Sequence, residues 1–205
     1  MLGYVAYENN GRYASQAREV QEQMIRLGYV ENRAIFVVAE GSRAIFNHAS
    51  NGLHIDIFYD KLDFCHVISL GGRLEADSPT VPLAELLLAK MQIVKISQKD
   101  IIDSIVLLLE HPFGETDREA MNAGRIARLC AADWGLWRTA TMNLDKVRRA
   151  TEADPHFDGK QRAQIIVQLD TLLARIGAEP KSLVWRLRAL VGDGIKWYSD
   201  VEEVT

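Results

Sequence analysis

Two charged residues of this chain stand in apolar surroundings, Asp56 in the run LHIDIFYD and Lys90 in the run PLAELLLAKMQIV. An ionised carboxylate or ammonium among apolar neighbours loses hydration, which a charged partner, a metal ion or a bound anion must replace. The stretch from Leu53 to Leu109 contains both residues and is therefore the candidate site.

The run around Asp56 alternates in the way expected of a strand with one apolar face. Successive side chains of a strand point to opposite sides of the sheet. One face then carries Leu53, Ile55, Ile57 and Tyr59, and the other carries His54, Asp56 and Phe58. We expect the side chain of His54 to lie beside that of Asp56.

Lys90 falls on the apolar face of a predicted helix, seven residues after Leu83. Such a lysine often lies at the edge of the apolar stripe, with its stem packed and its amine in water. Its ammonium could instead bind phosphate oxygens in a cleft or pair with Asp56. The sequence leaves these alternatives open.

Three further charged residues, Lys99, Asp100 and Asp103, open the next predicted helix. Acids in the first turn of a helix stabilise it by ~0.3–1 kcal/mol. A lysine and an acid four residues apart add ~0.2–0.5 kcal/mol. Ordinary helix stability is enough to explain these residues, and we favour that role over a binding role.

The elements that would position these residues are short strands, followed by helices. Strands are predicted for GYVAY, AIFVVA, RAIFNH, LHIDIFY and CHVIS, and a helix is predicted for residues 15–27. Asn51-Gly52 indicates a hairpin between the third and fourth of these strands. After Pro82 the chain reads as helical, with helix starts predicted at Ser97 and, by a full capping-box match, at Thr116 with Glu119.

This order of elements predicts an α+β fold, with a small mixed or antiparallel sheet and helices followed by a helical bundle. We place the α/β region at residues 1–80, the helical region at 81–200 and a tail at 201–205. The apolar spacing of Leu169, Leu172, Leu173 and Ile176 requires a packing partner within that bundle.

Composition excludes several classes of protein. The chain has 205 residues, 48% of them hydrophobic, with a net charge of −4, which describes an ordinary globular protein and gives no support for nucleic-acid binding. Cys65 and Cys130 form no CxxC pair, so reduced, buried thiols are expected. No signal peptide and no apolar run of the ~20 residues that span a membrane is evident. We expect a cytoplasmic protein.

Three stretches of the chain resemble a family. HIDIFYDKLDFCHVISL, VPLAELLLAKMQIVKISQKDIIDSIVLLLEH and CAADWGLWRTATMNLDKV are similar to prokaryotic nucleotidyltransferase-like proteins of the DNA polymerase beta-type superfamily, related to abortive-infection toxins. The resemblance runs nearly end to end. It implies transfer of a nucleoside monophosphate from a nucleoside triphosphate to an acceptor, with magnesium as cofactor.

The resemblance also implies roles for particular residues. In the superfamily a Gly-Gly or Gly-Ser turn holds the triphosphate, an Asp-x-Asp pair on a strand binds magnesium, and a third acid lies on a neighbouring strand. Asp56 matches that third acid, as metal ligand or base, and Lys90 matches a helical lysine near the nucleotide. Lys99, Asp100 and Asp103 match the polar start of the following helix.

The N-terminal motifs of the family have no counterpart in this sequence. GYVAY corresponds to the strand expected to carry the Asp-x-Asp pair, yet the chain reads Met1-Leu2-Gly3-Tyr4 there and has no Gly turn. Phosphoryl transfer with two metal ions depends on several carboxylates, so catalysis by this chain alone is not expected.

Two functions follow from this comparison. The first is a partial, N-terminally truncated nucleotidyltransferase whose intact form uses Mg²⁺ and a nucleoside triphosphate. The second is a non-catalytic binding or regulatory protein, which engages a second copy or another protein through the remnant cleft or an exposed sheet edge.

Overall fold

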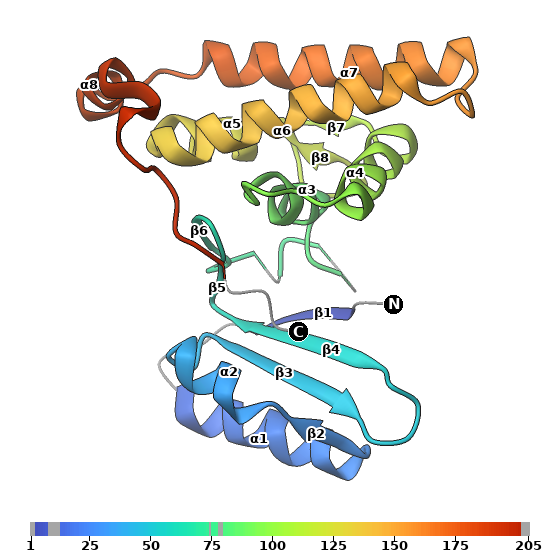
Figure 1. Ribbon diagram of the computed structural model, residues 1–205, viewed down its shortest axis with the longest axis vertical. Helices are drawn as coiled ribbons and strands as arrows, with labels where there is room; N and C mark the ends of the chain where they lie inside the picture. Colours follow the sequence, from blue (N-terminus) through green and yellow to red (C-terminus); the bar gives the residue numbers. More distant parts are fainter. Residues whose placement is uncertain (1–2, 8–12, 74, 78–79, 202–205) are drawn as a thin grey trace. The chain divides into compact units, whose positions relative to one another are not determined.

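The computed structural model describes residues 3–7, 13–73, 75–77 and 80–201 (Figure 1). The chain is an α+β protein that divides into two compact units. The first, which we call the sheet unit, comprises Met1–Asp63 and Val67–Glu75. The second, the helical unit, comprises Phe64–His66 and Ala76–Thr205.

The sheet unit is built on a four-stranded mixed sheet. Its strands follow the order β1 (Gly3–Tyr7), β4 (His54–Tyr59), β3 (Arg43–His48) and β2 (Tyr29–Glu31). β1 runs parallel to β4, whereas the other two pairs are antiparallel. The tight hairpin between β3 and β4 contains Gly52, whose φ of 68° suits glycine, and this confirms the hairpin predicted from Asn51-Gly52.

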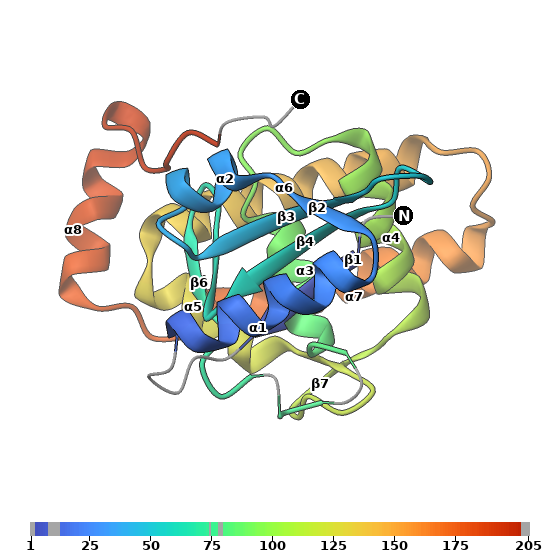
Figure 2. The same ribbon diagram turned by 90° about the horizontal axis from the view of Figure 1, so that it is seen from below.

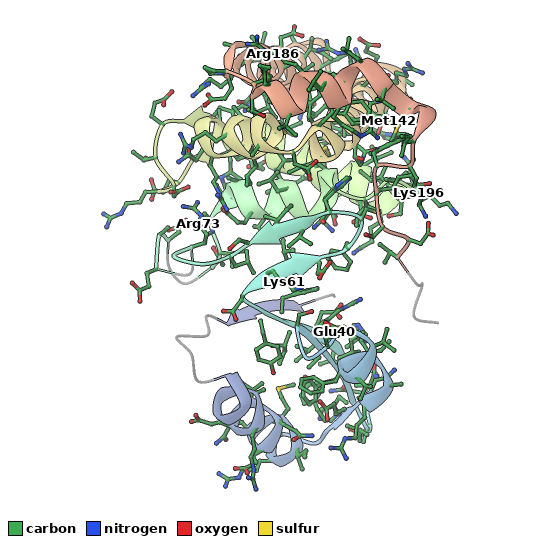
Figure 3. The ribbon with its side chains drawn as sticks, turned by 90° about the vertical axis from the view of Figure 1, so that its left-hand side faces the viewer. Glu40, Lys61, Arg73, Met142, Arg186 and Lys196 are labelled. Atoms are coloured by element: carbon green, nitrogen blue, oxygen red, sulfur yellow. The ribbon has the colours of Figure 1, made fainter. Side chains whose placement is uncertain are left out.

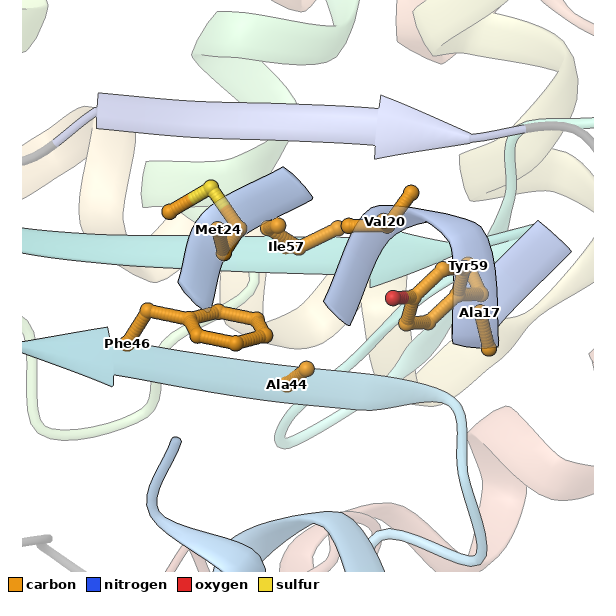
Figure 4. Packing of buried hydrophobic residues seen from close by; sticks show 7 residues of the cluster. All are labelled: Ala17, Val20, Met24, Ala44, Phe46, Ile57 and Tyr59. Atoms are coloured by element: carbon orange, nitrogen blue, oxygen red, sulfur yellow. The ribbon is translucent and has the colours of Figure 1, made fainter. Parts of the chain in front are cut away.

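One face of this sheet packs against helix α1 (Tyr13–Arg26), which lies nearer the viewer than the sheet in Figure 2. The core consists of Ala17, Val20 and Met24 of α1 together with Ala44, Phe46, Ile57 and Tyr59 of β3 and β4 (Figure 4). Ile55 packs against the same cluster. The predicted alternation in the strand of Asp56 is therefore confirmed, because its alternate apolar residues face the helix.

The strand predicted for AIFVVA is wrong, because its first five residues lie in helix α2 (Arg33–Val38) and Ala39 caps that helix. Phe36 packs against the core while Val37 and Val38 remain exposed, which is a helical distribution and not an alternating one. The helix ends where Glu40 adopts a left-handed φ of 48° and the amide of Gly41 donates to the carbonyl of Phe36. The β-branched composition of the run misled the prediction, since tertiary packing overrides such propensity.

A second ribbon in the sheet unit pairs β5 (Lys61–Asp63) with β6 (Val67–Ser69) in antiparallel fashion. The predicted strand CHVIS is thus confirmed over its last three residues. Cys65 and His66 belong to the helical unit.

The helical unit contains six helices, two very short strands and one 3₁₀ turn among its described residues (Figure 1). In chain order these are α3 (Leu83–Met91), α4 (Gln98–Glu110), β7 (Phe113–Gly114), β8 (Met121–Asn122), α5 (Ala123–Ala132), α6 (Trp134–Ala153), α7 (Gly159–Ala178), α8 (Leu183–Val191) and η1 (Gly192–Gly194). Leu169, Leu172 and Ile176 of α7 are buried, and α7 packs on α5 and α6. The predicted partner of this apolar stripe is therefore present.

One of the two predicted helix starts is confirmed. The hydroxyl of Ser97 accepts from the amide of Asp100 at 3.1 Å and caps α4. The start predicted at Thr116 is wrong, because α5 begins at Ala123 and is capped by the side chain of Asn122. Glu119 has a φ of 54°, which is incompatible with the first turn of a right-handed helix.

Candidate functional site

Asp56 lies in the middle of β4 and is 3% exposed. Its backbone pairs with that of Tyr4 in β1 on one side and that of Ile45 in β3 on the other. Two neighbouring strands therefore fix the position of this carboxylate.

Both oxygens of Asp56 have protein partners. Oδ1 accepts from Nε and Nη2 of Arg43, at 3.0 and 2.8 Å, and Oδ2 lies 3.3 Å from Nε2 of His54. Nδ1 of His54 lies 3.0 Å from Oδ1 of Asn47, which orients the imidazole. The predicted contact between His54 and Asp56 is confirmed, and the arginine completes a three-residue cluster.

Arg43 is the main residue of this cluster that sequence reasoning missed. It pairs in register with Phe58 of β4, and its guanidinium carbon lies 5.4 Å from the centroid of that ring. No local pattern indicated this contact, because it depends on the register of β3 against β4, which brings Arg43 to the same face as Asp56. Its side chain is 19% exposed, so the ion pair is largely withdrawn from water.

Lys90 belongs to a second charged cluster, in the helical unit. Its Nζ donates to Oδ1 of Asp100 at 2.7 Å and to Oδ2 of Asp103 at 3.0 Å. Lys99 lies at the rim of this cluster, with Nζ 3.9 Å from Asp103. The acids that Lys90 meets are therefore those of the next helix, and they bind an amine whose side chain is only 13% exposed.

The electrostatics of this cluster are visible in Asp100. Burial by itself raises the pKa of this carboxyl, but hydrogen bonds from Lys90 and Ser97 outweigh that effect and lower the pKa below its ordinary value. Asp100 is thus held ionised by the lysine. The cluster ties the C-terminal half of α3 to the start of α4.

The residues predicted from the sequence belong to two different units. His54 and Asp56 belong to the sheet unit, and Lys90, Lys99, Asp100 and Asp103 belong to the helical unit. Within each group the residues are joined by direct hydrogen bonds or ion pairs.

The surroundings of Asp56 do not suit a magnesium ion. Mg²⁺ requires a near-octahedral set of oxygen ligands, and one partner of Asp56 is a guanidinium that repels cations. Across residues 3–7, 13–73, 75–77 and 80–201, no three His, Cys, Asp or Glu residues are grouped so that they could hold a metal. The residues described around Asp56 therefore do not fit the expected cofactor.

The helical unit also contains a buried ion pair between Glu85 and Arg125. Glu85 is 1% exposed, and its Oε1 accepts from Nε of Arg125 at 3.1 Å. The sequence signal for this pair was the acid within the apolar run LAELLLA. Cys65 and Cys130 are free and buried, which confirms the prediction for the thiols.

Hollows occur in both units, within the part of the chain that the structure describes. The hollow of the sheet unit measures about 390 Å³ and lies between the end of α2 and the β4–β5 bend, with Ser42, Tyr59, Asp60 and Lys61 in its wall. The hollow of the helical unit measures about 310 Å³, and its wall contains Trp134, Trp185, Trp197 and Arg188. Neither wall contains Asp56 or Lys90.

Among the described helices, none combines the length and the apolar character needed to cross a lipid bilayer. In comparisons with known proteins, the chain matches no protein-family model, no curated protein and no solved structure.

Proposed function

We propose that this chain is a nucleotidyltransferase-like protein that acts by binding another protein and not by phosphoryl transfer. The observation that supports this proposal most strongly is the occupation of both Asp56 oxygens by Arg43 and His54. The acid that Asp56 matches in the resemblance acts as metal ligand or base. Here an internal guanidinium neutralises that carboxylate.

The energetics favour the ion pair over a metal. A magnesium ion at Asp56 would have to displace two hydrogen bonds from the largely buried guanidinium of Arg43. Breaking a buried ion pair in this way costs about 3–5 kcal/mol. The binding of phosphate by Lys90 would likewise require it to leave Asp100 and Asp103.

The second candidate function is the Mg²⁺-dependent binding of a nucleoside triphosphate. It is supported by one observation, the parallel pairing of β1 with β4. This places GYVAY beside the strand of Asp56, as the resemblance expects for the strand that carries the magnesium-binding pair. In this candidate Asp56 contacts the metal and Lys90 contacts phosphate.

A sheet edge is one surface through which the proposed binding could take place. The two edges are β1 and β2, and Val30 of β2 is 60% exposed. β2 has only three residues, and short edge strands are a common means of limiting strand pairing between molecules. The sheet edge is therefore a weaker candidate than an apolar surface elsewhere in the chain.

A thermal-shift experiment separates the two functions. The purified chain is heated with ATP, GTP, CTP or UTP, each with and without Mg²⁺, since a ligand that binds only the folded state raises the Tm. We expect no Mg²⁺-dependent rise. A rise that is lost in Asp56→Asn and kept in Asp63→Asn, an exposed acid of the same unit, would overturn the proposal in favour of the second candidate.

A further inference from the structure

Helix α8 turns an apolar side towards solvent. Its exposed residues follow a helical spacing, so that five side chains form one strip, which we call the outer stripe of α8. The stripe consists of Leu183 (66% exposed), Val184 (77%), Leu187 (60%), Leu190 (84%) and Val191 (47%). None of the nine residues of α8 is buried.

The opposite side of α8 attaches it to the bundle. Nε1 of Trp185 donates to the carbonyl of Cys130 at 3.0 Å, and the ring of Trp185 meets that of Trp137 edge-on, with centroids 5.1 Å apart. The helix therefore contacts the bundle through the side that carries Trp185. Among the described residues, no element covers the outer stripe. A contiguous exposed apolar patch of this kind marks an interaction site more often than a single exposed leucine does.

Two arginines flank the outer stripe. At about 100° per residue, Arg186 falls on one edge of the stripe and Arg188 on the other. Arg186 is exposed at the surface of the helical unit (Figure 3). Arg188 stacks over Trp134, with its guanidinium carbon 4.2 Å from the ring centroid.

Arg188 is held in place and still has donors to offer. Nη1 donates to the carbonyl of Gly192 at 2.6 Å, and Nη2 donates to that of Ile195 at 2.7 Å. Its other N–H groups have no partner among the residues that the structure describes. A guanidinium fixed in this manner is well suited to binding a carboxylate.

The stripe continues into the hollow of the helical unit. Val184 belongs to both, and Arg188 lies in the wall of the hollow with Trp134, Trp185 and Trp197. Asp133 is the one acid in that wall, and its Oδ1 is engaged by the amides of Gly135 and Leu136 at the start of α6. The hollow therefore offers a docked side chain an aromatic wall and a cationic donor.

We propose that the outer stripe and this hollow dock an amphipathic helix of another protein, whose apolar side covers the stripe and whose acidic side chains bind Arg186 and Arg188. This inference rests on the proposed binding function and names its surface and the chemistry of its partner.

A second copy of this chain fits the surface poorly. In a symmetric antiparallel pair of α8 helices centred on Leu187, the two arginines of one copy would face those of the other. Like charges placed opposite each other at an interface disfavour the pairing. The partner must instead carry acids beside its apolar residues, and charge complementarity is the reason for that choice.

The test uses two synthetic amphipathic helical peptides that share the same leucines at helical spacing. The charged residues of the polar face are all glutamates in the acidic peptide and all lysines in the basic peptide. The four tryptophans of the chain, Trp134, Trp137, Trp185 and Trp197, form one cluster of ring contacts that includes Trp185 of α8, so intrinsic emission reports on this surface. We expect a saturable change of emission with the acidic peptide and at least tenfold weaker binding of the basic peptide.

Variants show where the peptide binds. The double substitution Leu187→Ser with Leu190→Ser removes exposed apolar groups and is expected to weaken the acidic peptide at least tenfold. Val167→Ser on α7, where Val167 is 63% exposed, is the matched control and should leave binding unchanged. Arg186→Glu should reduce the preference for the acidic peptide, because it reverses one of the two flanking charges.

Several results would overturn the inference. These are equal binding of both peptides, no binding of the acidic peptide, and an affinity that the double serine variant leaves unchanged. Binding to vesicles of phosphatidylserine and phosphatidylcholine without binding of the acidic peptide would assign the stripe to a membrane surface. Self-association that the double serine variant abolishes would assign it to a second copy.

The proposed non-catalytic function is tested separately, by the thermal-shift experiment with nucleotides. If the acidic peptide does not bind and no nucleotide raises the Tm in the presence of Mg²⁺, the outer stripe is rejected as the binding surface. The role of Asp56 then stands as described. A nucleotide shift at Asp56 would reject the non-catalytic function whatever the peptide does.

Discussion

Arg43 and Asp56 form an ion pair between neighbouring strands, with Nη2 of the arginine 2.8 Å from Oδ1 of the acid. Both side chains are largely buried, at 19% and 4% exposure. His54 contacts the other carboxylate oxygen. Both oxygens of the acid that matches the family's site therefore contact side chains of the same sheet.

Removal of the arginine should be costly, because it leaves Asp56 buried without a counter-charge. We expect Arg43→Ala to lower the free energy of unfolding by about 3–5 kcal/mol in urea denaturation. Arg33→Ala, which removes an 84% exposed side chain 3.8 Å from Glu31, should cost less than about 1 kcal/mol. Equal costs for the two variants would show that the ion pair does not stabilise the sheet.

The cluster at Lys90 gives a prediction about one carboxyl group. Lys90→Met removes the main cation that holds the pKa of Asp100 low, so that pKa should rise in an NMR titration of the side-chain carboxyl carbon. Because the folded-state pKa is depressed, this acid stabilises the fold above pH ~4, and that stabilisation is lost as the pH falls through the folded-state pKa. Lys99→Met, at the exposed rim, is the control and should move the pKa of Asp100 far less. A pKa that stays low in Lys90→Met contradicts the assignment.

The burial of His66 gives a second prediction, a pH dependence of the free energy of unfolding at higher pH. Burial lowers the pKa of this imidazole, against a smaller opposing effect of Asp133, and its Nε2 lies 2.8 Å from Oγ1 of Thr139. The unfolded chain therefore takes up the proton first, and the free energy of unfolding should fall as the pH drops below about 6.5. In His66→Gln this slope should be reduced, whereas His156→Gln, with a 90% exposed side chain, should retain it. Identical slopes in all three proteins would exclude His66 as the cause.

Glu40 offers a stabilising substitution. A residue other than glycine in the left-handed region costs roughly 1–2 kcal/mol, and the φ of Glu40 is 48°. Glu40→Gly should therefore raise the free energy of unfolding, by about 0.5–1 kcal/mol once the greater freedom of glycine in the unfolded chain is counted. The same replacement at Glu22, within α1, should lower it by about 1 kcal/mol. A loss of stability in Glu40→Gly would show that its side chain makes a stabilising contact.

Features that depend on neighbouring residues could be predicted from the sequence. Contacts between residues that lie far apart in the sequence could not. Strand alternation predicted that His54 lies beside Asp56, and a hydroxyl at capping distance predicted the start of α4. These features depend on neighbours within a few positions along the chain. The strand predicted for AIFVVA is wrong because core packing overrides local preference. The helix start predicted at Thr116 and Glu119 is wrong because Glu119 adopts a left-handed conformation.

The candidate site depended on longer separations. Arg43 meets Asp56 across a hairpin whose register must first be known. Trp134 and Trp197 lie with centroids 6.2 Å apart although 63 positions separate them in the sequence, and no local pattern indicates that encounter. The exposed stripe of α8 likewise can be recognised only when the side of the helix that contacts the bundle has been identified through Trp185.

The most direct test of the account is the paramagnetic effect of Mn²⁺, in place of Mg²⁺, on the NMR spectrum of the chain with ATP present. We expect the amide signals of Ile55, Asp56 and Ile57 to broaden no more than those of the sheet as a whole, because Arg43 and His54 already bind the carboxylate. Selective broadening of these three signals that Asp56→Asn removes would place a metal at Asp56 and contradict the account.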